Sequence, residues 1–509
     1  MKRALIFVHR WLGVALCLVF LLWFPSAIGI MYWDFPDVGP ADVLTHAAPI
    51  DASKIRLSPA EAYAKLGVAD EPDDVVMTTF DGRPAYRFAS GFSQAIVYAD
   101  TGEEQLEIPD AMVRRIAESW TRQPAANARV ERVTEVDQWT VQMRIADVSP
   151  LWKFSWPDGE QVYVTQTTGD VVQHTTTGSR LGAYAGAIPH WLYFTPLRKN
   201  GPTWSRVVIW SSGIGTIAAI LGVVIGAWMY SPSKRYRYAG MPSSIPYRGQ
   251  KRWHTVLGLI FGAATITWAF SGMLSMDPFP SRETGGGLLE RGIDQQVLTD
   301  ALRGHARLAA FAARDPREVL TRLRAPVKQL ELTAFAGEPI YLATLAPGDT
   351  RIVPVNGDPA AAFDYQRIID IVKSAAGPGT VETSLLTQYD RYYLDRRRQR
   401  PLPVILARFN DAAASRFYID PKTARVVGSY DSNAWVNRWL YNGLHSLNFP
   451  WLYNYRPLWD IVVITFMVGG TALCVTSLIL AWRVVGRKLG GLAPGRSGEA
   501  LPDDLAIAD

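Results

Sequence analysis

Apolar residues gather in four long stretches, and the rest of the chain is mixed or polar. The stretches run from Ala4 to Met31, from Val207 to Tyr230, from Trp253 to Met276 and from Leu458 to Val485. Each is long enough to cross the hydrocarbon core of a bilayer, which takes about 20 residues of helix. The sequence therefore predicts a membrane-embedded bundle of four spanning helices with two large soluble segments.

These stretches set the boundaries of the predicted domains. We predict spans at residues 1–31, 204–230, 253–276 and 456–485, soluble domains at 32–203 and 277–455, a basic loop at 231–252 and a tail at 486–509. The first span is expected to remain in the mature protein, because its apolar run is much longer than the roughly 7–15 residues of a cleavable signal.

Short helices followed by strand-like runs fill both soluble domains. The predicted helices are residues 58–62, Ala111–Trp120, Pro316–Leu323 and Tyr365–Ala375. The predicted strands of the first domain are Val75–Thr79, Ala85–Ala89, Ala95–Tyr98, Arg129–Val133, Gln138–Ile145 and Gln161–Thr165. This order is typical of small α+β modules in which one helix covers one antiparallel sheet.

The formal net charge of +5 is explained by where the basic residues lie relative to the predicted spans. They precede the first span, fill the 231–252 loop and stand at the end of the fourth span. These three segments lie on the same side of the membrane if successive helices alternate in direction. Short segments rich in Lys and Arg stay in the cytoplasm. We therefore expect a bacterial inner-membrane protein in contact with lipid. Both termini would be cytoplasmic and both large domains periplasmic, and no nucleic-acid partner is expected.

The two halves of the chain repeat each other. His9, Gly13, Trp23 and Ser26 recur at a shift of 245 as His254, Gly258, Trp268 and Ser271. A second block, which includes His190, Trp204 and Gly215, recurs at a shift of 255 as His445, Trp459 and Gly470. The sequence therefore predicts a tandem duplication whose pseudo-twofold axis runs along the membrane normal.

Four of the seven histidines belong to this repeat. His9 and His254 lie just inside the cytoplasmic ends of spans one and three, whereas His190 and His445 precede spans two and four at the outer face. His9 and His190 are therefore expected near 20 Å apart across a core of about 30 Å. Only pairing across the two halves, His9 with His254 and His190 with His445, would bring two imidazoles to one metal ion.

Two imidazoles alone are a poor site for zinc or copper, which take three or four protein ligands. Haem b supplies its own four nitrogens and is apolar enough for a bundle core. We therefore predict two haems b per chain, with these four histidines as axial ligands of the iron. Interhelical hydrogen bonding is the structural alternative for any single histidine in a span. Covalent c-type attachment is excluded, since Cys17 and Cys474 lie inside spans and no Cys-x-x-Cys-His occurs.

Other residues have both a functional and a structural interpretation. Arg10 and Arg252 would either hold haem propionates or serve only as flanking positive charges. The repeat-related glycines would either leave room for a macrocycle or allow close helix packing; they are Gly13, Gly258, Gly213, Gly215, Gly469 and Gly470. The Tyr- and Arg-rich segment 388–400 would bind an anionic chelate or form a solvated hairpin near lipid headgroups. His46, His174 and His305 have no repeat partners, and we interpret them as surface residues.

The motifs resemble a known family. The strand–turn runs Tyr98–Glu103 and Tyr418–Pro421 look like PepSY modules, and the segments around His9 and His254 are similar to the span starts of the PepSY-associated transmembrane family. That family includes iron-regulated inner-membrane proteins and haem-containing siderophore reductases. The resemblance implies reduction of a ferric siderophore or another Fe(III) chelate in the periplasm, which is oxidoreductase activity in iron acquisition.

No nucleotide-binding motif occurs in the sequence, so the electrons are expected from a separate cytoplasmic reductase or from quinol. Two other functions remain open at this point. A quinol-linked respiratory component of the cytochrome b type would also bind haem. A non-enzymatic PepSY sensor, or an accessory to transport, would bind none.

Overall fold

The computed structural model describes residues 1–91, 93–278, 292–377 and 380–490. Four helices are long and apolar enough to cross a membrane: α1 (Lys2–Tyr32), α9 (Gly201–Met229), α10 (Gly249–Leu274) and α16 (Leu458–Gly490). They coincide with the predicted spans, so the chain is a multi-pass membrane protein with additional β-sheet domains. Residues 491–509 of the predicted tail and 279–291 of the second soluble domain lie outside the described residues.

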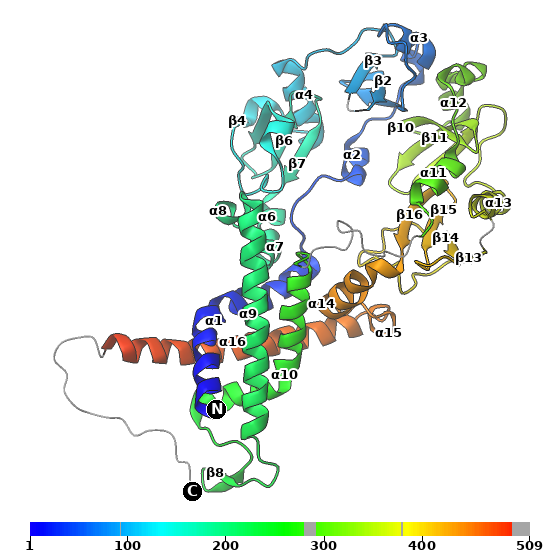
Figure 1. The fold of residues 1–509 in the computed structure, drawn as a ribbon. Helices are drawn as coiled ribbons and strands as arrows, with labels where there is room; N and C mark the ends of the chain where they lie inside the picture. The colour runs from blue at the N-terminus through cyan, green and yellow to red at the C-terminus, as the bar shows by residue number, and fades with distance from the viewer. Residues whose placement is uncertain (92, 279–291, 378–379, 491–509) are drawn as a thin grey trace.

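The four helices pack as a ring. α1 contacts α9 and α16, and α10 contacts the same two helices. α1 and α10 therefore face each other across the centre of the bundle, although they start the two different halves of the chain. In Figure 1 the sheets lie above the bundle, and the hairpin of β8 (Tyr236–Tyr238) and β9 (Met241–Ser243) lies below it. We call these the sheet side and the hairpin side.

Both halves contribute to one six-stranded antiparallel sheet. Its order is β12-β11-β10-β1-β2-β3. The strands are β1 (Asp74–Phe80), β2 (Arg83–Ser90), β3 (Ser93–Tyr98), β10 (Gln329–Phe335), β11 (Glu338–Ala346) and β12 (Asp349–Pro354). One core with residues of both halves, among them Met77 and Leu330, lies against this sheet. The sequence pattern predicted sheets within each half and did not indicate that they join.

The central pair of this sheet reveals the symmetry of the molecule. Val76 of β1 lies directly opposite Glu331 of β10, and the repeat shift of 255 converts position 76 into position 331. A residue that pairs with its own repeat equivalent lies on the axis that relates the two halves. The pseudo-twofold axis therefore passes through the Val76–Glu331 pair.

Each half also has a four-stranded sheet of its own. The first consists of β4 (Arg129–Val133), β5 (Leu151–Ser155), β6 (Gln161–Thr165) and β7 (Val171–Thr175), and the second of β13 (Val381–Leu386), β14 (Val404–Phe409), β15 (Arg416–Asp420) and β16 (Arg425–Tyr430). α4 (Asp110–Thr121) packs on β6, and α13 (Tyr365–Ala375) packs on β13 and β14. The predicted arrangement of one helix on one sheet is therefore present in each half.

The predicted strand at Gln138–Ile145 is wrong. The backbone N–H groups of Trp139 and Thr140 donate to the Asp137 carboxylate, so the chain turns there instead of joining a ladder. A short helix, α5 (Ile145–Val148), follows, and the strand that pairs with β4 is β5.

The remaining α-helices of the described residues are shorter. They are α2 (Pro40–His46), α3 (Pro59–Ala64), α6 (Thr177–Ala185), α7 (Ala187–Trp191), α8 (Thr195–Arg198), α11 (Gln295–Arg303), α12 (Pro316–Leu323), α14 (Leu444–Ser446) and α15 (Pro450–Tyr453). The π-helical segment η6 (Val436–Gly443) precedes α14. α6 and α7 lie against α1, and η6 and α14 lie against α10.

Two glycines permit the contact between α7 and α1. A Cβ atom on Gly29 of α1 would lie 2.7 Å from the Cα atom of Gly186, and a Cβ atom on Gly186 would lie equally close to the backbone of Gly29. The backbones touch at this point because neither residue has a side chain. This close approach brings α7, which carries His190, onto the sheet-side end of α1.

Candidate functional site

The structure brings together the residues of each predicted histidine pair. The ring centres of His190 and His445 are 5.9 Å apart at an interplanar angle of 55°. Those of His9 and His254 are 6.2 Å apart at 37°. In both pairs one histidine comes from each half of the chain, so neither half has a complete pair by itself.

The two pairs lie at opposite ends of the bundle. His190 contacts the backbone of Trp23, and Trp23 follows His9 by 14 residues on α1. A helix rises 1.5 Å per residue, so the two levels are separated by about 21 Å. This agrees with the depth expected from the sequence and excludes pairing of His9 with His190.

Each sheet-side histidine is oriented by the first helix of its own half. The Nδ1 atom of His190 donates to the carbonyl oxygen of Trp23 at 3.2 Å and lies 3.4 Å from the Ser26 hydroxyl. The Nδ1 atom of His445 lies 3.1 Å from the Ser271 hydroxyl. Ser26 and Ser271 are repeat equivalents, so the same contact is made twice.

The hairpin-side histidines are oriented by the second helix of their own halves. The Nδ1 atom of His9 donates to the carbonyl oxygen of Ala218 on α9 at 2.9 Å. The Nδ1 atom of His254 lies 3.2 Å from the Thr476 hydroxyl and 3.3 Å from the Ser477 hydroxyl on α16. Each histidine ring is therefore oriented by a hydrogen bond within its own half, whereas the two rings of a pair come from different halves.

These contacts determine which ring nitrogen is available. The hydroxyl groups of Ser26, Ser271, Thr476 and Ser477 each donate their own proton to a backbone carbonyl of their helix. Their oxygens therefore act as acceptors toward the histidines, and Nδ1 carries the proton in all four rings. Each neutral imidazole then has its free lone pair on Nε2, as a metal ligand requires. Within the described residues, none of the four Nε2 atoms has a hydrogen-bond partner.

The spacing of the rings suits a metal ion between them. With a metal–nitrogen bond of about 2 Å on each side, and a nitrogen about 1 Å from its ring centre, two axial imidazoles would have centres about 6 Å apart. Both observed separations agree with this value. Among the described residues, no group of three or more His, Cys, Asp or Glu side chains is placed to hold a metal ion, so each pair offers two protein ligands.

A cavity of about 650 Å³ contains the sheet-side pair. Its volume is within the range of roughly 300–1,000 Å³ that is typical of cofactor and ligand sites. The wall is largely apolar and includes many aromatic residues, among them Phe20, Trp23, Phe24, Trp268, Tyr441 and Trp459. An apolar planar group with two open axial positions fits such a wall.

The repeat-related glycines mostly serve helix packing. Cβ atoms on Gly215 and Gly470 would overlap the rings of Phe20 and Phe24, and one on Gly469 would overlap Phe261. At these three positions a phenyl ring occupies the space that the sequence left open to a macrocycle, whereas a Cβ atom on Gly13 would meet nothing within 4 Å. The glycine that touches a candidate ligand is Gly222, whose added Cβ atom would lie 2.7 Å from Cε1 of His9. It was not identified from the sequence, because its repeat equivalent is Ser477.

The two arginines predicted near the hairpin-side pair have other contacts. Arg252 donates to the Ser243 hydroxyl at 2.9 Å and lies over the Tyr238 ring, so it ties α10 to the β8–β9 hairpin. Arg10 is exposed and lies near the rings of Phe7 and Trp11 on its own helix. These contacts correspond to the structural interpretation of both residues, and a role with haem propionates stays a prediction.

The Tyr- and Arg-rich segment 388–400 is an irregular loop and not a hairpin. The Asp390 carboxylate anchors it by accepting from the Tyr418 hydroxyl and from the backbone N–H groups of Tyr392 and Tyr393. Asp137 makes the equivalent contacts with Tyr163 and with its own turn in the first half. Leu394–Arg396 and Arg400 of this loop line the sheet-side cavity. The sequence did not indicate this proximity to the histidine pair.

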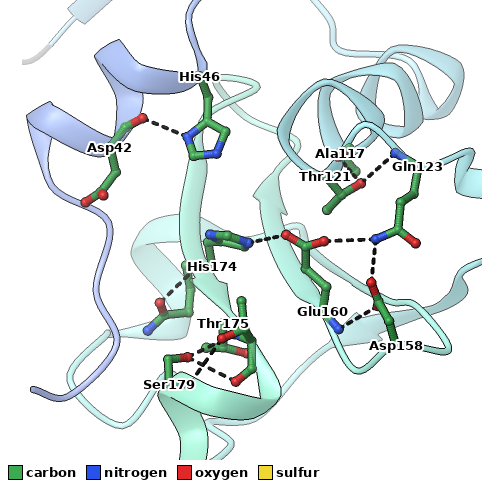
Figure 2. A network of polar contacts seen from close by, with 12 residues as sticks. Asp42, His46, Ala117, Thr121, Gln123, Asp158, Glu160, His174, Thr175 and Ser179 are labelled. Carbon is green, nitrogen blue, oxygen red and sulfur yellow. Dashed lines mark hydrogen bonds and ion pairs between the residues drawn. The ribbon is translucent and has the colours of Figure 1, made fainter. Parts of the chain in front are cut away.

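Two of the three remaining histidines are not simple surface residues. Figure 2 shows His174 on β7 in a polar network with Glu160 and Gln123, and His46 at the end of α2 hydrogen-bonded to the carbonyl oxygen of Asp42. The His46 ring stacks on Trp120 at 4.2 Å, and His174 Nε2 lies 2.7 Å from Glu160 Oε1. These half-buried contacts fasten α2 to the first four-stranded sheet. His305 is exposed, as expected.

No protein-family model matches the chain, and no curated protein is significantly similar to it.

Proposed function

We propose that the chain is a di-haem b electron-transfer protein of the bacterial inner membrane that passes electrons to ferric chelates, most simply in ferric-siderophore reduction. His9 and His254 would hold one haem, and His190 and His445 the other. The observation that carries this proposal is the common orientation of all four histidines. Each has Nδ1 hydrogen-bonded within its own half and an Nε2 atom without a hydrogen-bond partner among the described residues, and the centre of its partner ring lies about 6 Å away.

The chain's own residues would supply binding and orientation. Ser26 and Ser271 would hold the sheet-side imidazoles in the Nδ1–H form, and Ala218 and Thr476 would do so for the hairpin-side imidazoles. Hydrogen-bond partners of this kind fix the orientation of the imidazole ring and raise its basicity as a metal ligand. When bound, haem supplies one-electron oxidation and reduction at the iron. Two such centres at opposite ends of the bundle would carry electrons across most of the bilayer.

The direction of transfer rests on topology and on the family resemblance. Basic residues concentrate on the hairpin side, so this side is proposed to be cytoplasmic. The sheet-side pair would then lie at the periplasmic face, beneath the PepSY-like sheets. Electrons would enter from a separate cytoplasmic reductase or from quinol and leave to a ferric siderophore or another Fe(III) chelate outside.

An absorbance spectrum of the purified protein tests this proposal. From haem-replete cells we expect a reduced-minus-oxidised spectrum of low-spin haem b with two bis-histidine centres, and about two haems per chain. A colourless protein would disprove electron transfer and favour a sensor or transport accessory. A protein that contains haem but reduces only a quinone analogue would favour the respiratory cytochrome.

A further inference from the structure

Among the described residues, three charged side chains other than histidine line the sheet-side cavity. They are Asp395, Arg396 and Arg400, all from the 388–400 loop. The rest of the wall is apolar or carries neutral polar groups such as Asn442 and Asn448. An aromatic cavity with cations at its edge is suited to a ligand that is apolar over most of its surface and anionic at one end.

Two of the three charges are already balanced. The Asp395 carboxylate accepts from the backbone N–H groups of Arg397 and Arg400 within its own loop. The Arg396 guanidinium donates to Asp34 at 2.6 Å and to the carbonyl oxygen of Ile30 at 3.0 Å, which joins the loop to the end of α1.

Arg400 has no such partner. Its guanidinium lies 5.4 Å from the centre of the Tyr393 ring, and no ion pair of Arg400 occurs among the described residues. The Tyr389 hydroxyl donates to the carbonyl oxygen of Arg400 and so fixes the backbone. Arg400 lines the cavity and is exposed, so this residue lies at the mouth of the cavity and not in its interior.

We infer that Arg400 binds the propionate carboxylates of the sheet-side haem. This inference rests on the proposed function. Haem is apolar except for two carboxylates at one edge, and a carboxylate at an apolar wall is costly unless a cation meets it. An arginine donates to a carboxylate in a bidentate, charge-assisted contact. The residue assigned to the carboxylates is therefore Arg400, and not Arg10 or Arg252 on the hairpin side.

Release of haem to an excess of apomyoglobin tests this assignment in the full-length protein in detergent. Arg400→Gln removes the charge at the mouth. Arg398→Gln is the matched control, because Arg398 belongs to the same loop and is exposed but does not line the cavity. We expect one of the two haems to leave Arg400→Gln at least several-fold faster than it leaves Arg398→Gln or the parent, and the other haem to leave at the parental rate.

Reconstitution with haem dimethyl ester, in which both propionates are blocked, identifies the interacting group. With the ester, Arg400→Gln and the parent should release haem at the same rate. If Arg400→Gln still releases the ester faster, the arginine stabilises the loop and the inference is wrong.

The inference is also wrong if Arg400→Gln keeps haem as tightly as Arg398→Gln but no longer binds ferric citrate, since the cation would then serve an external chelate. A parent that binds no haem would instead overturn the proposed function itself.

Discussion

The imidazole rings of His190 and His445 lie 5.9 Å apart although 255 positions separate the two residues in the chain. Each ring is held through Nδ1 by the first helix of its own half, and its partner ring comes from the other half. The arrangement explains why a duplicated chain suits this site. One half provides a single oriented imidazole at each end of the bundle, and the second half completes both pairs.

Replacement of the histidines should separate the two haems. His9→Ala or His254→Ala should lower the haem content from about two per chain to about one, and His190→Ala or His445→Ala should remove the other haem. The reason is that each ring pair contains one histidine of each half. Haem content by the pyridine haemochrome method measures the result. The double variant His9→Ala/His254→Ala should also retain one haem, whereas His9→Ala/His190→Ala should retain none.

Gly222→Ala should remove the hairpin-side haem without any change to a histidine. The new methyl group would lie 2.7 Å from Cε1 of His9, closer than carbon atoms approach, so the ring must leave its position. Gly486→Ala on α16 is the matched control, because its Cβ atom would meet nothing within 4 Å and the residue is exposed. We expect a loss of about one haem in Gly222→Ala and none in Gly486→Ala. Equal haem contents in the two variants would contradict the hairpin-side site.

Electron exit should depend on the sheet-side pair. In proteoliposomes with ferric citrate and an Fe(II) trap outside and a reductant inside, His445→Ala should still become reduced at the remaining haem. It should reduce the external chelate much more slowly than the parent, because electron tunnelling decreases steeply over the roughly 21 Å between the two levels. Parental rates in His445→Ala would show that the sheet-side haem is not the exit.

The first soluble module should lose stability in acid through Asp137. Burial alone would raise the pKa of Asp137, but the hydrogen bond from Tyr163 and the charge of Lys153 hold that pKa below its ordinary value. A lowered pKa means that the carboxylate stabilises the fold above the unfolded value of about 4 and that this contribution is lost as the pH falls through the folded value.

Asp137→Asn should therefore lower the melting temperature by several degrees at pH 7, corresponding to about 1–3 kcal/mol. The difference from the parent should decrease as the pH falls below about 4. Thermal unfolding followed by tryptophan fluorescence at pH 7 and at stepwise lower pH values measures this. Tyr163→Phe, which removes one donor, should give a smaller effect of the same sign. A difference that is independent of pH would refute the role of the carboxylate charge.

Much of the architecture follows from local and periodic properties of the sequence. The length and hydropathy of the apolar stretches were sufficient to predict the four spans. A helix in lipid must hydrogen-bond its own backbone groups and present apolar side chains. The repeat and the depth of each histidine were sufficient to propose which rings meet. The helices near Ala111–Trp120 and Tyr365–Ala375 were also predictable from their amphipathic pattern.

The tertiary structure alone decided how distant segments meet. The pairing of Val76 with Glu331, the proton positions imposed by Ser26 and Ser271, the proximity of Gly222 to His9 and the position of Arg400 at the cavity all depend on packing between segments far apart in the chain. Hydropathy describes how strongly a residue prefers lipid, a core or water, but it carries no information about which neighbour it will meet there. That choice is made by side-chain shape and by hydrogen bonding in the folded protein.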